Sequence, residues 1–133
     1  MTRPDTAIVL AAGLGKRMRP ITDTIPKPLV RIAGKTLLDW GLDSLAAAGV
    51  AKAVVNVHYL PEQIIAQVAA RRAPKIVISD DSDRLLDSAG GIVKALPELG
   101  QKPFYILNAD TFWIDHGPLN LGRLALAWDA AKM

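Results

Sequence analysis

The 133-residue chain has no cysteine, few aromatic residues (5%) and no long hydrophobic run. Without cysteine it can form neither disulfide bonds nor thiolate metal sites. Its apolar stretches are short and interrupted, which excludes a segment long enough to cross a bilayer. The N-terminus also has no basic start leading into an apolar signal-peptide core. These absences favour a cytoplasmic protein with no membrane partner.

Basic residues are unevenly distributed along the chain. The net charge is only +3, yet residues 16–35 carry six cations and one anion. Proteins that bind nucleic acid more often spread cations along a face and interleave aromatic side chains for base stacking. Because aromatic residues are scarce here, the local excess predicts a compact phosphate pocket and no nucleic-acid partner.

Strand-like and helix-like segments alternate along the sequence. Their apolar patterns predict strands at residues 7–12, 53–58, 75–79 and 103–109, and helices at residues 36–48, 61–72, 88–96 and 120–131. Thr36, Ser88 and Asn120 are the expected helix caps. The alternation predicts an α/β fold, a Rossmann-like three-layer α/β/α arrangement with a mostly parallel sheet.

No predicted strand follows the last helix. The sheet is therefore expected to be incomplete on its C-terminal side, and residues 1–133 are expected to form the N-terminal part of a longer domain. An unfinished sheet leaves an exposed edge that can pair with another strand. We expect self-association through that edge.

A glycine-bearing loop follows the first predicted strand. Residues 10–20 read LAAGLGKRMRP, so Gly13 and Gly15 allow close backbone approach and three cations follow. Backbone N–H groups and guanidinium forks in such a loop bind phosphate oxygens. The loop is not a Walker A motif, because Arg17 stands where Ser or Thr is required, and Met18 replaces the third glycine of the dinucleotide motif. Ligands of parallel sheets bind beyond the carboxyl ends of strands, which predicts a site between this loop and the end of the fourth strand.

The motif LAAGLGKRMRP, followed by Thr22 and by PKPL at residues 26–29, resembles the signature of the sugar-phosphate nucleotidylyltransferases. Further segments resemble that family in the same order, namely AGV at 48–50, NVHYL at 56–60, LDSAGG at 86–91 and NAD at 108–110. Within the family the chain is most similar to members that join UTP to N-acetylmuramate-1-phosphate in peptidoglycan recycling. Mannose-1-phosphate guanylyltransferases, cytidylyltransferases and a non-catalytic nucleotide-binding module are the alternatives.

The resemblance implies a nucleotidyltransferase. A sugar-1-phosphate oxygen would attack the α-phosphorus of a nucleoside triphosphate, with Mg²⁺ as cofactor, and pyrophosphate would leave. The resemblance assigns catalytic roles to Arg17, which would hold the β,γ-phosphates, and to Lys27, which would face the α-phosphate or the sugar phosphate. Asp110 would bind the metal. Nucleotide contacts are expected from Leu10, Ala11, Ala12, Gly13, Gly15, Lys16, Ser88, Ala89, Gly90 and Asn108.

Family members are longer than this chain, and their remaining part supplies further strands and a second metal-binding aspartate. Residues 1–133 are therefore expected to hold the nucleotide-binding half and to have impaired activity. His58 is expected to make a structural hydrogen bond, because the attacking phosphate is already an anion. Asp80, Asp81 and Asp83 are expected to be solvated loop charges. Trp40 is expected to pack on a helix, and Trp113 to border the sugar site.

Overall fold

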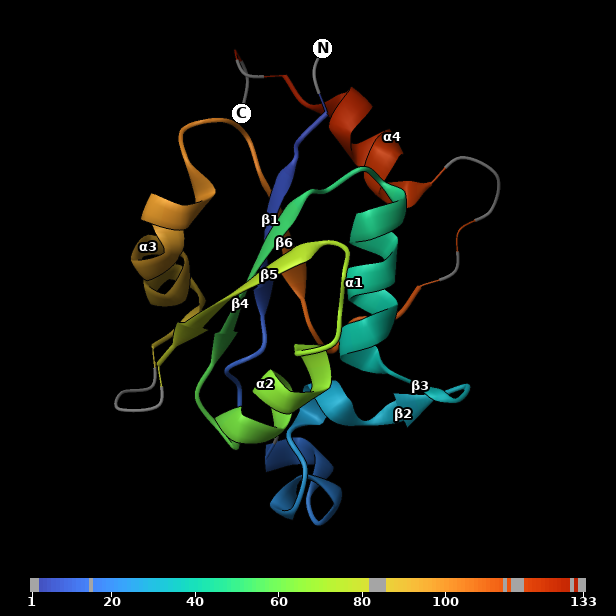
Figure 1. The fold of residues 1–133 in the computed structure, drawn as a ribbon, viewed down its shortest axis with the longest axis vertical. Coiled ribbons are helices and arrows are strands. Elements are labelled where there is room, and N and C mark those ends of the chain that lie inside the picture. Colours follow the sequence, from blue (N-terminus) through green and yellow to red (C-terminus); the bar gives the residue numbers. More distant parts are fainter. Residues whose placement is uncertain are drawn as a thin grey trace.

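A parallel four-stranded sheet forms the centre of the molecule (Figure 1). The computed structural model describes residues 3–14, 16–81, 86–113, 115, 119–129 and 131. The sheet order is β5-β4-β1-β6, with bounds β1 Thr6–Leu10, β4 Lys52–Val57, β5 Lys75–Asp80 and β6 Tyr105–Asn108. Leu10 is in register with Asn56 on one side and with Asn108 on the other. The carboxyl ends of β4, β1 and β6 therefore meet at one end of the sheet.

Helices cover both faces of the sheet, which gives the three layers expected from the sequence. Their bounds are α1 Leu37–Ala47, α2 Pro61–Val68, α3 Ser88–Leu99 and α4 Asn120–Ala127. One core cluster joins α1, α2 and α4 to alternate strand residues such as Val9 and Val55. A second cluster places α3 on the other face, over Ile8 and Val54. None of the helices in the described residues has the length and apolar character needed to cross a membrane.

All of the predicted strands and helices are present, with corrected boundaries. Thr36 caps α1 as predicted, because its Oγ1 accepts a hydrogen bond from the Asp39 N–H at 3.0 Å. The cap of α3 is Asp87 rather than Ser88, since the Asp87 carboxylate accepts from the Gly90 N–H at 2.6 Å. The same helix continues three residues past the predicted end at residue 96.

Two other helices are shorter than predicted. Helix α2 ends at Val68 instead of residue 72, and α4 ends at Ala127 instead of residue 131. Asn120 makes no side-chain cap for α4. Its N–H instead donates to Asp115 Oδ1 at 2.7 Å. The Asp115 carboxylate therefore caps the start of α4, a role that was predicted for the Asn120 side chain.

The segment between β1 and α1 contains short elements that the sequence patterns do not predict. These are the 3₁₀ helices η1 Lys16–Met18, η2 Ile21–Asp23 and η3 Lys27–Leu29, and a hairpin of β2 Arg31–Ile32 and β3 Lys35–Thr36. The hairpin turns at Ala33 and Gly34, which have φ angles of 53° and 81°. Two successive positive φ angles are the geometry of a type I′ turn.

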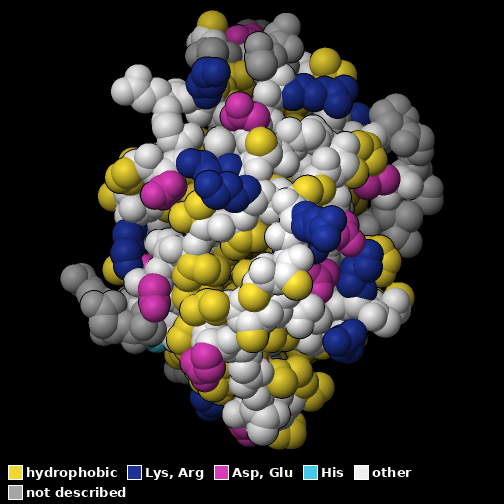
Figure 2. All heavy atoms as spheres, in the orientation of Figure 1, with side chains coloured by type: hydrophobic (Ala, Val, Ile, Leu, Met, Phe, Trp, Pro, Cys, Tyr) yellow, Lys and Arg dark blue, Asp and Glu magenta, His cyan; other side chains and the backbone are white. Residues whose placement is uncertain are grey.

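The face formed by α2 and β5 carries basic, acidic and apolar side chains side by side, and its Lys and Arg residues do not gather into a stripe (Figure 2). Part of this mixed charge is paired. Arg71 donates to Asp39 Oδ1 at 3.0 Å and also to Asp43, both on α1. Lys35 Nζ lies 2.5 Å from Asp43 Oδ2. This network ties the segment after α2 and the hairpin to α1.

Acidification is expected to weaken the network around Asp43. Partial burial acts to raise the pKa of this carboxyl, but hydrogen bonds from Lys35 and Arg71 outweigh it and lower the pKa below its ordinary 3.8. A lowered folded-state pKa means that the stabilisation is present above the unfolded pKa and is lost as pH falls through the folded pKa. The melting temperature of Asp43→Asn should therefore fall less steeply than that of the wild type below about pH 4. Equal slopes for the two proteins would contradict the assignment.

Candidate functional site

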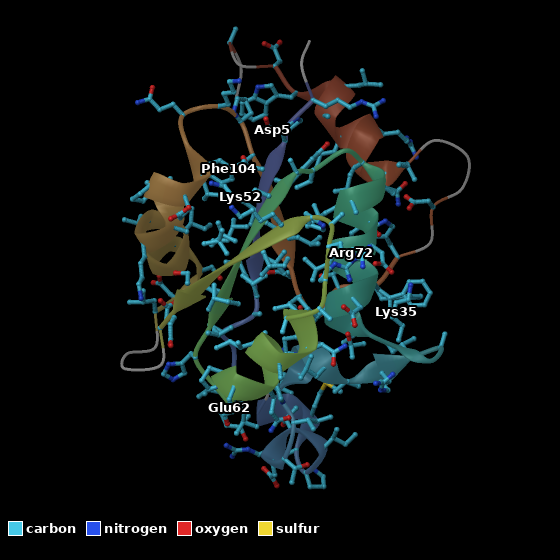
Figure 3. The ribbon with its side chains drawn as sticks, in the orientation of Figure 1. Asp5, Lys35, Lys52, Glu62, Arg72 and Phe104 are labelled. Carbon is cyan, nitrogen blue, oxygen red and sulfur yellow. The ribbon has the colours of Figure 1, made fainter. Side chains whose placement is uncertain are left out.

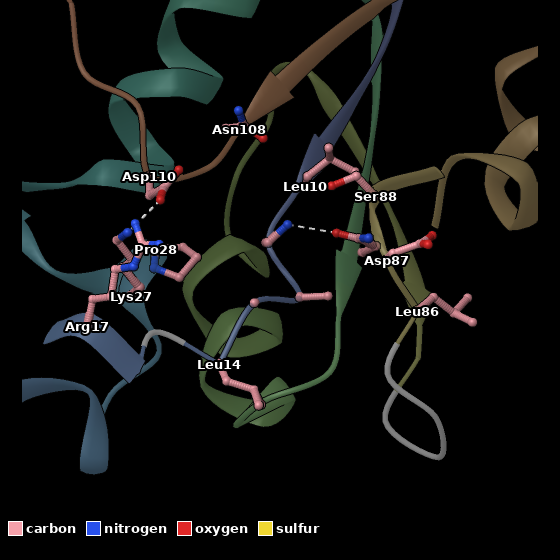
Figure 4. A pocket seen from close by; sticks show the side chains of 14 residues that line it. Leu10, Leu14, Arg17, Lys27, Pro28, Leu86, Asp87, Ser88, Asn108 and Asp110 are labelled. Carbon is pink, nitrogen blue, oxygen red and sulfur yellow. Dashed lines mark hydrogen bonds and ion pairs between the residues drawn. The ribbon is translucent and has the colours of Figure 1, made fainter. Parts of the chain in front are cut away.

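A pocket of about 930 Å³ opens at the carboxyl ends of β1, β4 and β6. Figure 4 shows two facing walls, one with Arg17, Lys27 and Asp110 and the other with Asp87 and Ser88. Its lining consists of Leu10, Ala11, Ala12, Gly13, Leu14, Arg17, Lys27, Pro28, Asn56, Leu86, Asp87, Ser88, Asn108 and Asp110. The position agrees with the rule for ligand sites of parallel sheets.

The first wall is built around an ion pair between Lys27 and Asp110. Lys27 Nζ lies 2.7 Å from Asp110 Oδ2, and the two side chains are 31% and 39% exposed. Lys27 stands between Pro26 and Pro28, which are both buried and fix the backbone on either side of it. The Ala109 N–H donates to Leu10 O at 3.1 Å, which continues the sheet ladder up to Asp110. A cation and a carboxylate are thus held by rigid backbone at the pocket edge.

The second wall is the start of α3. Asp87 Oδ1 is engaged in capping the Gly90 N–H, and Ser88 is the first helical residue. A Cβ at Gly90 would approach Asp87 Oδ1 to 3.1 Å, which is tight. Gly90 thus leaves room for the cap, and neither it nor Ala89 is among the residues that line the pocket, so their contact with a nucleotide stays a prediction.

Asn56 forms the floor between the two walls and was not predicted as a site residue. Its Oδ1 accepts a hydrogen bond from the buried Ala11 N–H at 2.7 Å, which anchors the loop after β1 to β4. A Cβ placed on Gly91 would lie 2.6 Å from Asn56 Nδ2, so α3 approaches this amide closely. The available signal was a polar residue inside the apolar strand AVVNV.

The pocket brings together nine of the thirteen residues predicted for the site. They are Leu10, Ala11, Ala12, Gly13, Arg17, Lys27, Ser88, Asn108 and Asp110. Gly15 and the Lys16 side chain lie outside the described residues. Sequence reasoning missed five lining residues, namely Leu14, Pro28, Asn56, Leu86 and Asp87. Leu14, Pro28 and Asp87 are next to predicted residues. Asn56 contacts Ala11, a residue distant in the sequence.

Gly13 is exposed at the pocket, and the fold does not require a glycine there. Its φ lies outside the left-handed region, and an added Cβ would meet no atom within 4 Å. Neither packing nor backbone conformation therefore explains why this position is a glycine. Gly13 itself lines the pocket.

Predictions for residues outside the pocket divide into confirmed and wrong ones. His58 Nδ1 lies 2.6 Å from Asp81 O, the structural hydrogen bond that was expected. The prediction of a solvated Asp81 is wrong, because this side chain is fully buried and paired with Lys94 on α3. Asp80 is exposed, and Asp83 lies outside the described residues.

The tryptophans lie away from the pocket lining. Trp40 is on α1, donates its Nε1–H to Ile32 O at 2.8 Å, and meets Phe112 edge-on with ring centroids 5.3 Å apart. Trp113 packs against the core on the side of α1. Its position near the sugar stays a prediction.

Within the described part of the chain, no three His, Cys, Asp or Glu residues gather into a ready metal cage. Asp110 nevertheless suits a hard cation that arrives with a ligand. Its carboxylate is partly exposed and opens into the pocket. Mg²⁺ commonly takes one or two protein carboxylates and completes its shell with phosphate oxygens and water.

Comparison with known proteins assigns a family to this arrangement. A family model described as the MobA-like NTP transferase domain matches residues 7–130. N-acetylmuramate alpha-1-phosphate uridylyltransferase of Caulobacter vibrioides is 48% identical, over 98% of this chain and 55% of its own length. Mannose-1-phosphate guanyltransferase of Hypocrea jecorina is 37% identical, over 77% of this chain and 29% of its own length.

A solved structure agrees with these sequence matches. The inositol-1-phosphate CTP transferase from T. maritima superposes with a TM-score of 0.71 at 26% identity, over 82% of this chain and 44% of that chain. The chain therefore spans about half the length, or less, of the proteins it matches. Their names refer to three different nucleotides, so membership of this family does not by itself determine which base the chain binds.

Proposed function

The chain belongs to the MobA-like NTP transferase family, and on that premise we propose that it transfers a nucleotidyl group from a nucleoside triphosphate to a sugar-1-phosphate and releases pyrophosphate. The observation that carries the proposal is the Lys27–Asp110 pair, set 2.7 Å apart in a pocket that also holds Arg17. UTP and N-acetylmuramate-1-phosphate are the favoured substrates, because the uridylyltransferase relative is 48% identical over nearly the whole chain.

The reaction needs positioning and charge neutralisation more than proton transfer. A phosphate oxygen of the sugar-1-phosphate forms a bond to the α-phosphorus, and the bond from that phosphorus to the bridging oxygen of the pyrophosphate breaks. The nucleophile is already anionic, so no general base is required. Arg17 would hold the β,γ-phosphates with its planar fork, and Lys27 would place a point charge at the α-phosphate. Gly13 would let the backbone approach the phosphates.

Asp110 would hold Mg²⁺, which neutralises phosphate charge when bound. Lys27 already contacts this carboxylate, so Lys27 and a metal ion held by Asp110 would face the same phosphate group. The other carboxylate of the described lining, Asp87, is engaged as a helix cap. Asp110 is thus the one carboxylate of the described lining that is not a helix cap, so metal affinity would rest mostly on the nucleotide. The 133 residues alone should then bind nucleotide but transfer slowly.

Thermal shift with UTP, GTP, CTP and dTTP, each with and without Mg²⁺, tests the proposal. A ligand that binds only the folded state at 100 times its Kd stabilises by about 2.7 kcal/mol. UTP with Mg²⁺ should give the largest shift. A larger shift with GTP or CTP would change the proposed nucleotide substrate but not the proposed reaction class. No shift with any triphosphate would refute nucleotide binding by this chain.

Replacing Gly13 by alanine is expected to weaken UTP binding about tenfold without lowering the melting temperature. The added methyl group meets no protein atom within 4 Å, and because Gly13 lines the pocket we expect the methyl group to hinder the approach of the phosphates. Gly49→Ala is the matched control, since Gly49 has a φ of +90°. That control should lose about 1 kcal/mol of stability and keep UTP affinity. Isothermal titration and thermal unfolding separate the two effects, and unchanged affinity in Gly13→Ala would contradict the assignment.

Self-association through β6 is a further part of the proposal. Within the described residues β6 pairs only with β1, and Ile106 on this strand is 55% exposed. An edge strand with an exposed apolar side chain invites pairing with another strand, and lysine at such a position opposes it. Light scattering should therefore show dimers at high concentration that Ile106→Lys reduces. Val93→Lys, at an exposed position on α3, is the control, and a wild-type monomer at every concentration would refute the association.

A further inference from the structure

Asp81 is a buried carboxylate that the proposed transfer reaction does not use. It directly follows β5, and its side chain is 0% exposed. Lys94 Nζ, from α3, lies 2.7 Å from its Oδ1, whereas Oδ2 has no hydrogen-bond partner among the described residues. A charge in such a place is costly unless it is paired. The folded state therefore depends on Lys94 reaching this point.

The backbone holds Asp81 firmly at the end of the sheet. Its N–H donates to Val57 O at 2.7 Å, and its carbonyl accepts from His58 Nδ1 at 2.6 Å. Lys94 Nζ also donates to Asp80 O at 2.5 Å. The position of Asp81 is thus fixed by the backbone, and Lys94 connects α3 to it.

Helix α3 carries one wall of the pocket. Lys94 lies six residues after Ser88, less than two helical turns from the wall. The helix also contacts the sheet through apolar side chains such as Ala95 and Leu99, and through a longer ion pair near its other end between Lys52 and Glu98. Apolar burial is non-directional, whereas a charge-assisted hydrogen bond fixes a distance and an angle. The ion pair therefore restricts sliding and rotation of α3 in a way that the apolar contacts do not.

Resting on the proposed nucleotide binding, we infer that Asp81 and Lys94 are positioning residues that set the wall of α3 at the correct distance from Lys27, and thereby set nucleotide affinity. Neither residue lines the pocket. Only the Asp81 end of this pair is buried, since the Lys94 side chain is 44% exposed. Ion pairs with a buried member commonly add little stability compared with neutral replacements of similar shape, yet they can specify one geometry. Stability alone therefore gives no sufficient reason for this pair, and positioning does.

The double variant Asp81→Asn/Lys94→Met removes both charges and keeps similar shapes. We expect UTP, with Mg²⁺, to bind it at least tenfold more weakly at a temperature where the protein is folded, with little change in melting temperature. The pair Lys52–Glu98 offers a matched control, because it also joins the sheet to α3, at a distance of 3.4 Å. Lys52 lies at the amino end of β4, far from the pocket end of the sheet (Figure 3).

The control Lys52→Met/Glu98→Gln should keep wild-type UTP affinity. The single variant Lys94→Arg should also keep most of that affinity, because it retains a cation beside Asp81. If the double variant does not fold, Lys94→Gln is the second test, because it removes the charge that makes the bond to Asp81 charge-assisted: UTP should bind it more weakly, and wild-type affinity in this variant would overturn the inference. Wild-type affinity in a folded double variant, or an equal loss in the control, would overturn the inference and leave nucleotide binding intact. A wild-type chain that binds no triphosphate would overturn the proposed function and this inference together.

Discussion

Lys27→Met should slow nucleotidyl transfer by about 10³-fold and leave the fold intact, the size of effect seen when one preorganised charge or donor is removed from a transition state. Lys27 Nζ is 2.7 Å from Asp110 Oδ2, at the edge of the pocket. The charge on the α-phosphate group develops in the transition state, so the lost ammonium group affects the rate more than ground-state binding. Because the pair is partly exposed, its loss should cost less than about 1 kcal/mol of stability.

Single-turnover release of pyrophosphate, with the protein in excess over UTP, measures this rate even when transfer is slow. UTP affinity should fall by no more than about tenfold, so rate and binding separate. Lys75→Met is a suitable control, since Lys75 is exposed at the start of β5 and does not line the pocket. A wild-type rate in Lys27→Met would contradict the proposed role of Lys27 in the reaction. A slower rate in Lys75→Met would indicate a nonspecific effect of charge.

The alternating sequence pattern predicted the layers of the fold, because each strand and helix buries a continuous apolar face. Boundaries were less predictable where tertiary contacts override local preference. Helix α3 continues through Pro97, which would normally mark a helix end. It does so because Leu99, at 3% exposure, belongs to the core beneath α3, and Gly100 closes the helix with an N–H bond to Leu96 O. The contact of Leu99 with the core is not visible in the local pattern, and Gly100 is a local stop signal that the proline outweighed.

Site residues were predictable where the chemistry lies in one short segment. The loop after β1 and the Lys27 and Asp110 positions carry their own signals of glycine, charge and strand end. Asn56 and Asp81 act through residues far along the chain, since Asn56 binds Ala11 and Asp81 binds Lys94. A pattern that places an aspartate in a loop predicts solvation, and only the packed structure reveals that α3 supplies the cation. Long-range pairing is thus the part that the sequence left open.

Asn56→Ala is expected to destabilise the protein by about 2 kcal/mol, because it leaves the buried Ala11 N–H without the acceptor that now lies 2.7 Å away. In a domain of this size that loss corresponds to roughly 4–8 °C in melting temperature. Gly91→Ala should cost about 1–3 kcal/mol by a different route, since its Cβ would lie 2.6 Å from Asn56 Nδ2. Both changes also disturb the floor of the pocket, so UTP affinity should fall with stability.

The double variant Asn56→Ala/Gly91→Ala distinguishes this contact from two independent losses. Truncating Asn56 removes the atom that the new methyl group would strike, so the double variant should be at least about 1 kcal/mol more stable than the sum of the single losses predicts. Chemical denaturation of the four proteins measures the coupling. Gly13→Ala serves as the glycine control, because its added Cβ meets no atom within 4 Å. Additive losses would mean that Gly91 and Asn56 do not constrain each other, and α3 would then owe its close approach to the sheet to other contacts.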